Sequence, residues 1–121
     1  MSTILTVNIS RGFQMFPPMS IPNVKKVYMY PKPVPMNWGD KKFCQLASEE
    51  MGIEPTVGKV FLFYNRKKDQ LKIFFRDTDG AQILHKWLPN NTFLLPAPEQ
   101  DKPFIAIERK NLAKIFKTDI F

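Results

Sequence analysis

The 121-residue sequence is poor in the residues that build metal and nucleotide sites. Its single cysteine, Cys44, excludes an internal disulfide, and with a single histidine, His85, the usual Cys/His metal-ligand sets cannot form. The five glycines are scattered, and none belongs to a phosphate-binding loop. We therefore expect no cofactor, no metal and no catalytic residue, and a reducing cytoplasmic location.

Long apolar runs are also missing. The longest, residues 60–64, is far shorter than the roughly 20 residues that span a bilayer, and the N-terminus has no signal-peptide pattern, so no membrane association is expected. A hydrophobic fraction of 44%, with eleven phenylalanines, is enough for one core. We expect one domain over residues 23–121, preceded by an irregular N-terminal extension over residues 1–22, where several prolines prevent a long regular element.

The middle of the chain is rich in strand-forming residues. Residues 58–64 and 70–76 flank a polar five-residue loop, which is typical of a β-hairpin. Residues 81–88 and 92–95 follow after short connections, so an antiparallel meander of four strands is the simplest arrangement. Shorter strands are expected at residues 24–30 and 104–107. Alternation in the second hairpin strand predicts a core face and a partly polar face, the latter formed by Lys72, Phe74 and Arg76.

Two segments have helical spacing. Residues 38–51 place Phe43, Leu46 and Ala47 on one stripe, and Gly52 follows as a helix-ending residue. Residues 108–117 form a second, more basic helix. The predicted fold is therefore α+β, a mainly antiparallel β-meander sheet of four to six strands packed with two helices.

The formal charge of +7 favours nucleic acid, an anionic membrane or an acidic protein as a partner. Basic residues gather at the predicted hairpin tip and along the strands that follow it. The candidate nucleic-acid-binding residues are Arg66, Lys67, Lys68, Lys72, Arg76 and Lys86. On the predicted polar sheet face, Phe74 could stack on bases while the cations bind phosphates. A solvated, non-binding sheet face is the alternative interpretation.

Asp77, Asp79 and Gly80 form the only Asp-x-Asp-Gly sequence in the chain. A calcium loop needs a glutamate at its twelfth position, and Leu88 is found there. Aspartate commonly begins turns and glycine accepts a positive φ, so a structural turn is the favoured interpretation. An enzyme site combining these aspartates with His85 is the alternative.

The motifs of the chain resemble those of a known family when they are taken in order. They are Gly58-x-Val60-Phe61-Leu62-Phe63, a basic hairpin tip, Leu71-Lys72-Ile73, Asp77-x-Asp79-Gly80, Lys86-x-Leu88, Phe93 and Pro96. In this respect the chain resembles the TnpB-type accessory protein encoded by the second open reading frame of insertion sequences of the sixty-six family. The resemblance covers about residues 24–120.

This resemblance implies a non-catalytic accessory protein for DNA transposition, acting beside a separate transposase. DNA and the transposase of the same element are the expected partners. In the alternative interpretation the chain is a protein-protein interaction module without direct DNA binding, which docks through Trp38, Trp87 and the proline-rich loop between residues 31 and 35.

Overall fold

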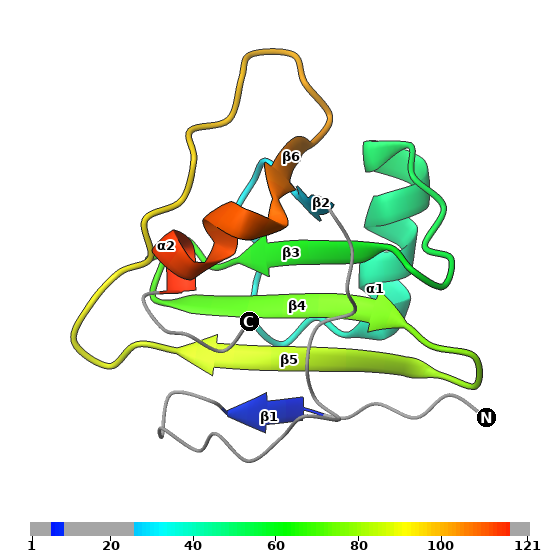
Figure 1. The fold of residues 1–121 in the computed structure, drawn as a ribbon, viewed down its shortest axis with the longest axis horizontal. Coiled ribbons are helices and arrows are strands. Elements are labelled where there is room, and N and C mark those ends of the chain that lie inside the picture. The colour runs from blue at the N-terminus through cyan, green and yellow to red at the C-terminus, as the bar shows by residue number, and fades with distance from the viewer. Residues whose placement is uncertain (1–5, 9–25, 117–121) are drawn as a thin grey trace.

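A computed structural model describes residues 6–8 and 26–116 of the protein. They form one six-stranded sheet in the order β1-β5-β4-β3-β2-β6, covered by helices (Figure 1). The strands are β1 (Thr6–Asn8), β2 (Lys26–Met29), β3 (Val60–Tyr64), β4 (Gln70–Arg76), β5 (Ala81–Trp87) and β6 (Ile105–Glu108). The helices are α1 (Asp40–Gln45), continued by a π-helical segment at Leu46–Met51, and a 3₁₀ turn at Arg109–Asn111 that leads into α2 (Leu112–Phe116). The predicted α+β class is confirmed.

The centre of the sheet consists of three of the four strands of the predicted meander. β3 and β4 pair in antiparallel register from Val60↔Phe75 to Tyr64↔Leu71, and β4 pairs with β5 from Gln70↔Trp87 to Arg76↔Ala81. Both connections are too short for a crossover helix, so antiparallel pairing is the only arrangement that they permit. The predicted hairpin around residues 65–69 is confirmed.

The outer strands differ from a simple meander. β2 runs parallel to β3, because helix α1 lies between them in the chain and supplies the crossover that a parallel pair requires. β1 runs parallel to β5, while β6 returns antiparallel to β2. Three of the five pairings are therefore antiparallel and two are parallel, so the sheet is mixed.

Residues 92–95, the predicted fourth meander strand, are not a strand. The edge of β5 that this strand would occupy is taken by β1. The segment instead passes over the sheet, where the Phe93 amide donates a 2.7 Å hydrogen bond to the carbonyl of Lys68 and the Phe93 ring is buried. Of the predicted irregular extension over residues 1–22, only Thr6–Asn8 is among the described residues, and these form β1.

Both faces of the sheet are buried, which accounts for the uninterrupted apolar sequence of β3. On the α1 face, Phe43 stacks on Phe63 with ring centroids 4.1 Å apart, and Phe61 and Phe74 complete the cluster. On the α2 face, the core includes Leu62, Ile73, Leu112 and Ile115. The prediction that Phe74 lies on a partly polar face was therefore wrong, because α1 covers that part of the sheet.

Helix α1 and its π-helical continuation follow the predicted pattern of buried residues, and their packing fixes the position of Trp38. Phe43, Leu46 and Ala47 are buried as expected, and Gly52 ends the helical run with a left-handed φ of 73°. The amide of Gly52 bonds to the carbonyl of Ala47, five residues earlier, which is the π-helical pattern. Packing of α1 against the sheet places Trp38, two residues before the helix, beside Lys72 of β4.

Candidate functional site

The tip of the β3–β4 hairpin is held in one conformation by Asn65. Its side-chain oxygen accepts hydrogen bonds from the amides of Asp69 (3.1 Å) and Gln70 (3.0 Å), and its side-chain nitrogen donates to the Asp69 carboxylate at 2.6 Å. The Lys68 amide bonds to the carbonyl of Asn65, and Lys68 adopts a left-handed φ of 60°. Asparagine favours turns because its side chain bonds to the following backbone in this way.

The tip presents three consecutive cations to solvent. Arg66, Lys67 and Lys68 are all exposed. Lys72 lies a short distance along β4 on the α1 face, half-buried, and its ammonium donates a 3.1 Å hydrogen bond to the carbonyl of Trp38. Burial lowers the pKa of Lys72. An ammonium has three protons, so this bond leaves donors for a further acceptor. We call these four residues the tip cations.

Arg76 is exposed but is remote from the tip cations. It lies at the opposite end of β4, where β4 turns into β5. Three strand residues lie between Arg76 and Lys72, so their Cα atoms are four steps apart, about 13 Å. The structure thus brings four of the six predicted binding residues to one end of the sheet and places Arg76 at the other.

Lys86 is only 5% exposed. In β5, side chains alternate between the two sheet faces, so His85 lies on the α1 face and Lys86 on the buried α2 face. Burial lowers the pKa of Lys86. Lys86 was predicted to contact phosphate because it is a basic residue in a strand that alternates polar and apolar residues. Its burial argues against that contact.

Asp77, Asp79 and Gly80 lie in the short connection between β4 and β5. The Asp77 amide bonds to the Gly80 carbonyl at 3.0 Å, and one Asp77 carboxylate oxygen accepts a bond from the Asp79 amide. The other oxygen accepts a 2.7 Å hydrogen bond from the Gln82 side chain. The bond from Gln82 is the main cause that lowers the pKa of Asp77. The Asp77 carboxylate is therefore occupied in closing the turn.

Trp87 lies close to the tip cations, whereas it was predicted to lie in a protein-docking region. It is 42% exposed at the end of β5, directly opposite Gln70, the first residue of β4. A 2.8 Å bond from the Leu88 amide to the Asp69 carbonyl ties this strand end to the hairpin tip. Counting residue pairs along β4 and β5 outward from the Asp77–Gly80 turn would have predicted that Trp87 lies opposite Gln70. Trp38, its predicted companion, instead lies under the ammonium of Lys42, 4.8 Å from the ring centroid.

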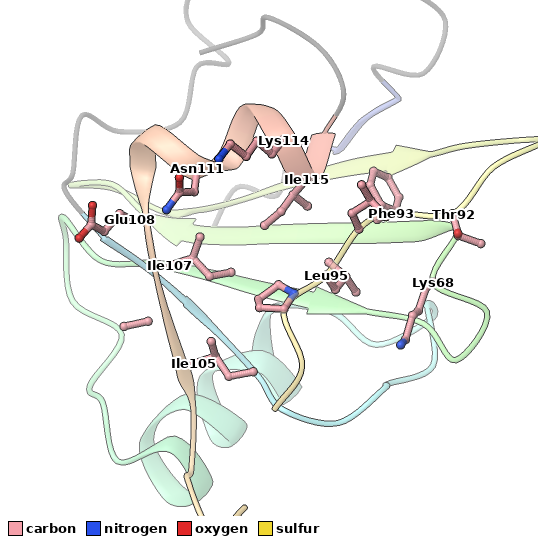
Figure 2. A pocket seen from close by; sticks show the side chains of 13 residues that line it. Lys68, Thr92, Phe93, Leu95, Ile105, Ile107, Glu108, Asn111, Lys114 and Ile115 are labelled. Carbon is pink, nitrogen blue, oxygen red and sulfur yellow. The ribbon is translucent and has the colours of Figure 1, made fainter. Parts of the chain in front are cut away.

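Two hollows adjoin the tip. The smaller, about 450 Å³, lies between the proline-rich loop and the hairpin and is lined by Pro33, Met36, Arg66 and Lys67 among others. The larger is an open groove of about 850 Å³ on the α2 face, bounded by β6, α2 and the segment 92–96 (Figure 2). Apolar side chains dominate its lining, and Lys68 and Lys114 stand on opposite sides of it.

Among the described residues, no helix has the length and apolar character needed to cross a bilayer. Within the same part of the chain, no three His, Cys, Asp or Glu side chains gather as a metal site would require.

The fold and site define a small basic α+β domain that presents cations at one hairpin tip. A family profile described as IS66 Orf2 like protein matches residues 25–118, which is most of the chain. The chain therefore belongs to the IS66 Orf2-like family, and this membership implies an accessory role in transposition. No curated protein and no solved structure gives a significant match.

Proposed function

We propose that this protein is a non-catalytic accessory factor of DNA transposition that acts in the cytoplasm and contacts DNA through the tip cations. The observation that carries the proposal is the run of three exposed cations, Arg66 to Lys68, on a tip that Asn65 holds by three hydrogen bonds. Lys72 extends the run onto the α1 face. A fixed array of cations binds phosphates without reading base sequence, and it positions a protein on DNA.

The residues that could have suggested an enzyme are engaged in structural contacts. Asp77 closes the β4–β5 turn with Gln82 and Asp79. The Nε2 atom of His85 lies 2.8 Å from the side-chain oxygen of Gln70, and burial together with the charge of Lys72 lowers the pKa of His85. Because these side chains at both ends of the sheet serve structural contacts, they favour a binding role over catalysis.

The salt dependence of DNA affinity tests the proposal. Each phosphate neutralised on duplex DNA contributes about −0.9 to the slope of log affinity against log salt, so the four tip cations predict a slope of about −3.6. Replacing two of them, Arg66→Gln with Lys67→Gln, should weaken binding and reduce the slope to about −1.8. Fluorescence anisotropy with a labelled duplex measures both quantities.

A matched control removes the same charge elsewhere. Arg76→Gln with Lys110→Gln removes two exposed cations near the other end of the sheet, and this variant should keep the wild-type slope. Absence of binding at low salt would refute a DNA contact. Equal losses in the two double variants would show that net charge, rather than the tip, supplies the affinity.

The apolar groove favours a second candidate function, docking of the transposase from the same element. Leu94 at its edge is 66% exposed, and the floor is formed by Ile105 and Ile107 of the edge strand β6. With Lys68 and Lys114 on either side, the groove suits an apolar segment flanked by acidic residues. This location differs from the predicted anchor at Trp38 and Trp87.

Co-purification with the transposase after nuclease treatment tests the second candidate. Leu94→Asp should abolish capture, whereas Val57→Asp, at an exposed apolar residue in the loop before β3, should not. Capture that disappears with nuclease treatment alone would show DNA bridging and would leave the groove without this role.

A further inference from the structure

Trp87 is placed where an indole ring has little structural reason to be exposed. It is the last residue of β5, and the pairing of β1 with β5 covers only Ile83, Leu84 and His85. Within the part of the chain that the structure describes, Trp87 has no partner residue on β1, and it is 42% exposed. Tryptophan is highly buried on average in folded proteins, so an indole this exposed beside a cationic site is a candidate contact for a ligand.

The surroundings of Trp87 are cationic and hydrogen-bonding. Trp87 shares the α1 face with Lys72 and His85, because Gln70↔Trp87 and Lys72↔His85 are successive same-face pairs of the β4–β5 register. Same-face diagonal neighbours such as Lys72 and Trp87 lie about 7–8 Å apart, within reach of long side chains. The exposed cations of the tip, Arg66 to Lys68, precede Gln70 in the chain and are separated from it by Asp69.

This combination of an indole face and cations matches the chemistry of an unpaired nucleotide. Aromatic rings bind nucleic acid by stacking on a base, while neighbouring cations bind the phosphates of the same strand. In a duplex the base faces are already stacked on each other, so an exposed indole on a sheet surface cannot reach them. Trp38 does not provide a second platform, since the ammonium of Lys42 occupies its ring face.

We infer that this end of the sheet binds single-stranded DNA, with Trp87 stacking on an unpaired base and the tip cations contacting the flanking phosphates. The inference rests on the proposed DNA contact and adds the form of DNA that the site prefers. Gln70 and His85, joined at 2.8 Å, lie between the indole and Lys72 and offer polar atoms to the sugar or base edge.

The test uses the full chain with Trp38→Phe, in which fluorescence comes from Trp87 alone. Addition of oligothymidine, about 12 nucleotides long to cover one domain-sized site, should quench this emission. A duplex with the same number of phosphates should quench it much less. Against oligothymidine, Trp87→Ala should lower affinity about 5- to 150-fold, the range that corresponds to loss of one base stack.

Two variants keep the result interpretable. Trp87→Phe retains an aromatic face and should recover most of the affinity, whereas Val57→Ala removes exposed apolar surface from a remote loop and should change nothing. Unchanged affinity in Trp87→Ala, or tighter binding of duplex than of oligothymidine, would overturn this inference while leaving the DNA contact intact. Failure of both DNA forms to bind at low salt would overturn the proposed function as well.

Discussion

The Asn65 side chain gives the sharpest test of how the tip is built. Asn65→Ala removes three hydrogen bonds, two from the amides of Asp69 and Gln70 and one to the Asp69 carboxylate. At about 1 kcal/mol for each, the free energy of unfolding should fall by about 2–3 kcal/mol. For a chain of this length that corresponds to a decrease of about 10 °C in Tm. Urea unfolding followed by circular dichroism measures the change.

Substitutions that exchange the amide and carboxylate of Asn65 and Asp69 show whether the loss of stability comes from the hydrogen bonds or from the change in side-chain size. Asn65→Asp keeps an oxygen that accepts hydrogen bonds from the two amides. It also replaces the side-chain nitrogen that donates to the Asp69 carboxylate at 2.6 Å with a second carboxylate oxygen, so the two side chains repel each other. It should be destabilising at neutral pH. Adding Asp69→Asn restores the donor from the opposite side, so the double variant should recover most of the loss. A double variant no more stable than Asn65→Asp would refute the network.

The same variants predict a specific effect on DNA binding. Asn65→Ala leaves Arg66, Lys67 and Lys68 in place, so the number of phosphate contacts is unchanged. We expect weaker binding with the wild-type slope of log affinity against log salt, since loosening the tip adds an ordering cost without removing charge. A reduced slope would contradict this expectation, because it would mean that fewer phosphates are contacted once the hairpin geometry is loosened.

Three further outcomes are expected. Phe43→Ala should lower the free energy of unfolding by about 3–5 kcal/mol in urea denaturation, because it removes a fully buried ring stacked on Phe63; a loss under 1 kcal/mol would contradict this packing. Lys86→Met should leave the salt slope of DNA binding unchanged, since Lys86 is only 5% exposed. Burial and the charge of Lys72 hold the pKa of His85 below its usual 6.5, so the unfolded chain binds the proton more tightly than the folded chain. The free energy of unfolding should therefore fall as the pH drops below 6.5. His85→Gln should remove this part of the pH dependence in thermal melts.

Local patterns predicted the parts of the fold that depend on local contacts. The hairpin around residues 65–69, the buried stripe at Phe43, Leu46 and Ala47, and the helix end at Gly52 are all found in the structure. In each case the signal is a periodicity or a turn residue within a few positions of the feature. Such signals do not require knowledge of which segments meet in space.

The errors arose where distant segments decide the outcome. Phe74 is buried because α1 packs over β4, and residues 92–95 are excluded from the sheet because β1 occupies the edge of β5. Lys86 lies on the α2 face, which no neighbouring residue in the sequence reveals as buried. The nearness of Trp87 to Asp69 was also missed, because it depends on the β4–β5 register; the docking role of Trp87 stays a prediction.

The order of the strands has a consequence for how long each candidate surface persists. The tip cations lie in the turn between β3 and β4 and on β4, and Trp87 ends β5. The pairings of these three strands join neighbouring parts of the chain, whereas β6 pairs with β2 across about 80 residues. As a four-residue edge strand, β6 should detach in sub-global opening events that leave the central meander intact. Amides of β4 should therefore exchange with solvent deuterium far more slowly than those of β6, so the groove is the transient surface and the hairpin tip the permanent one.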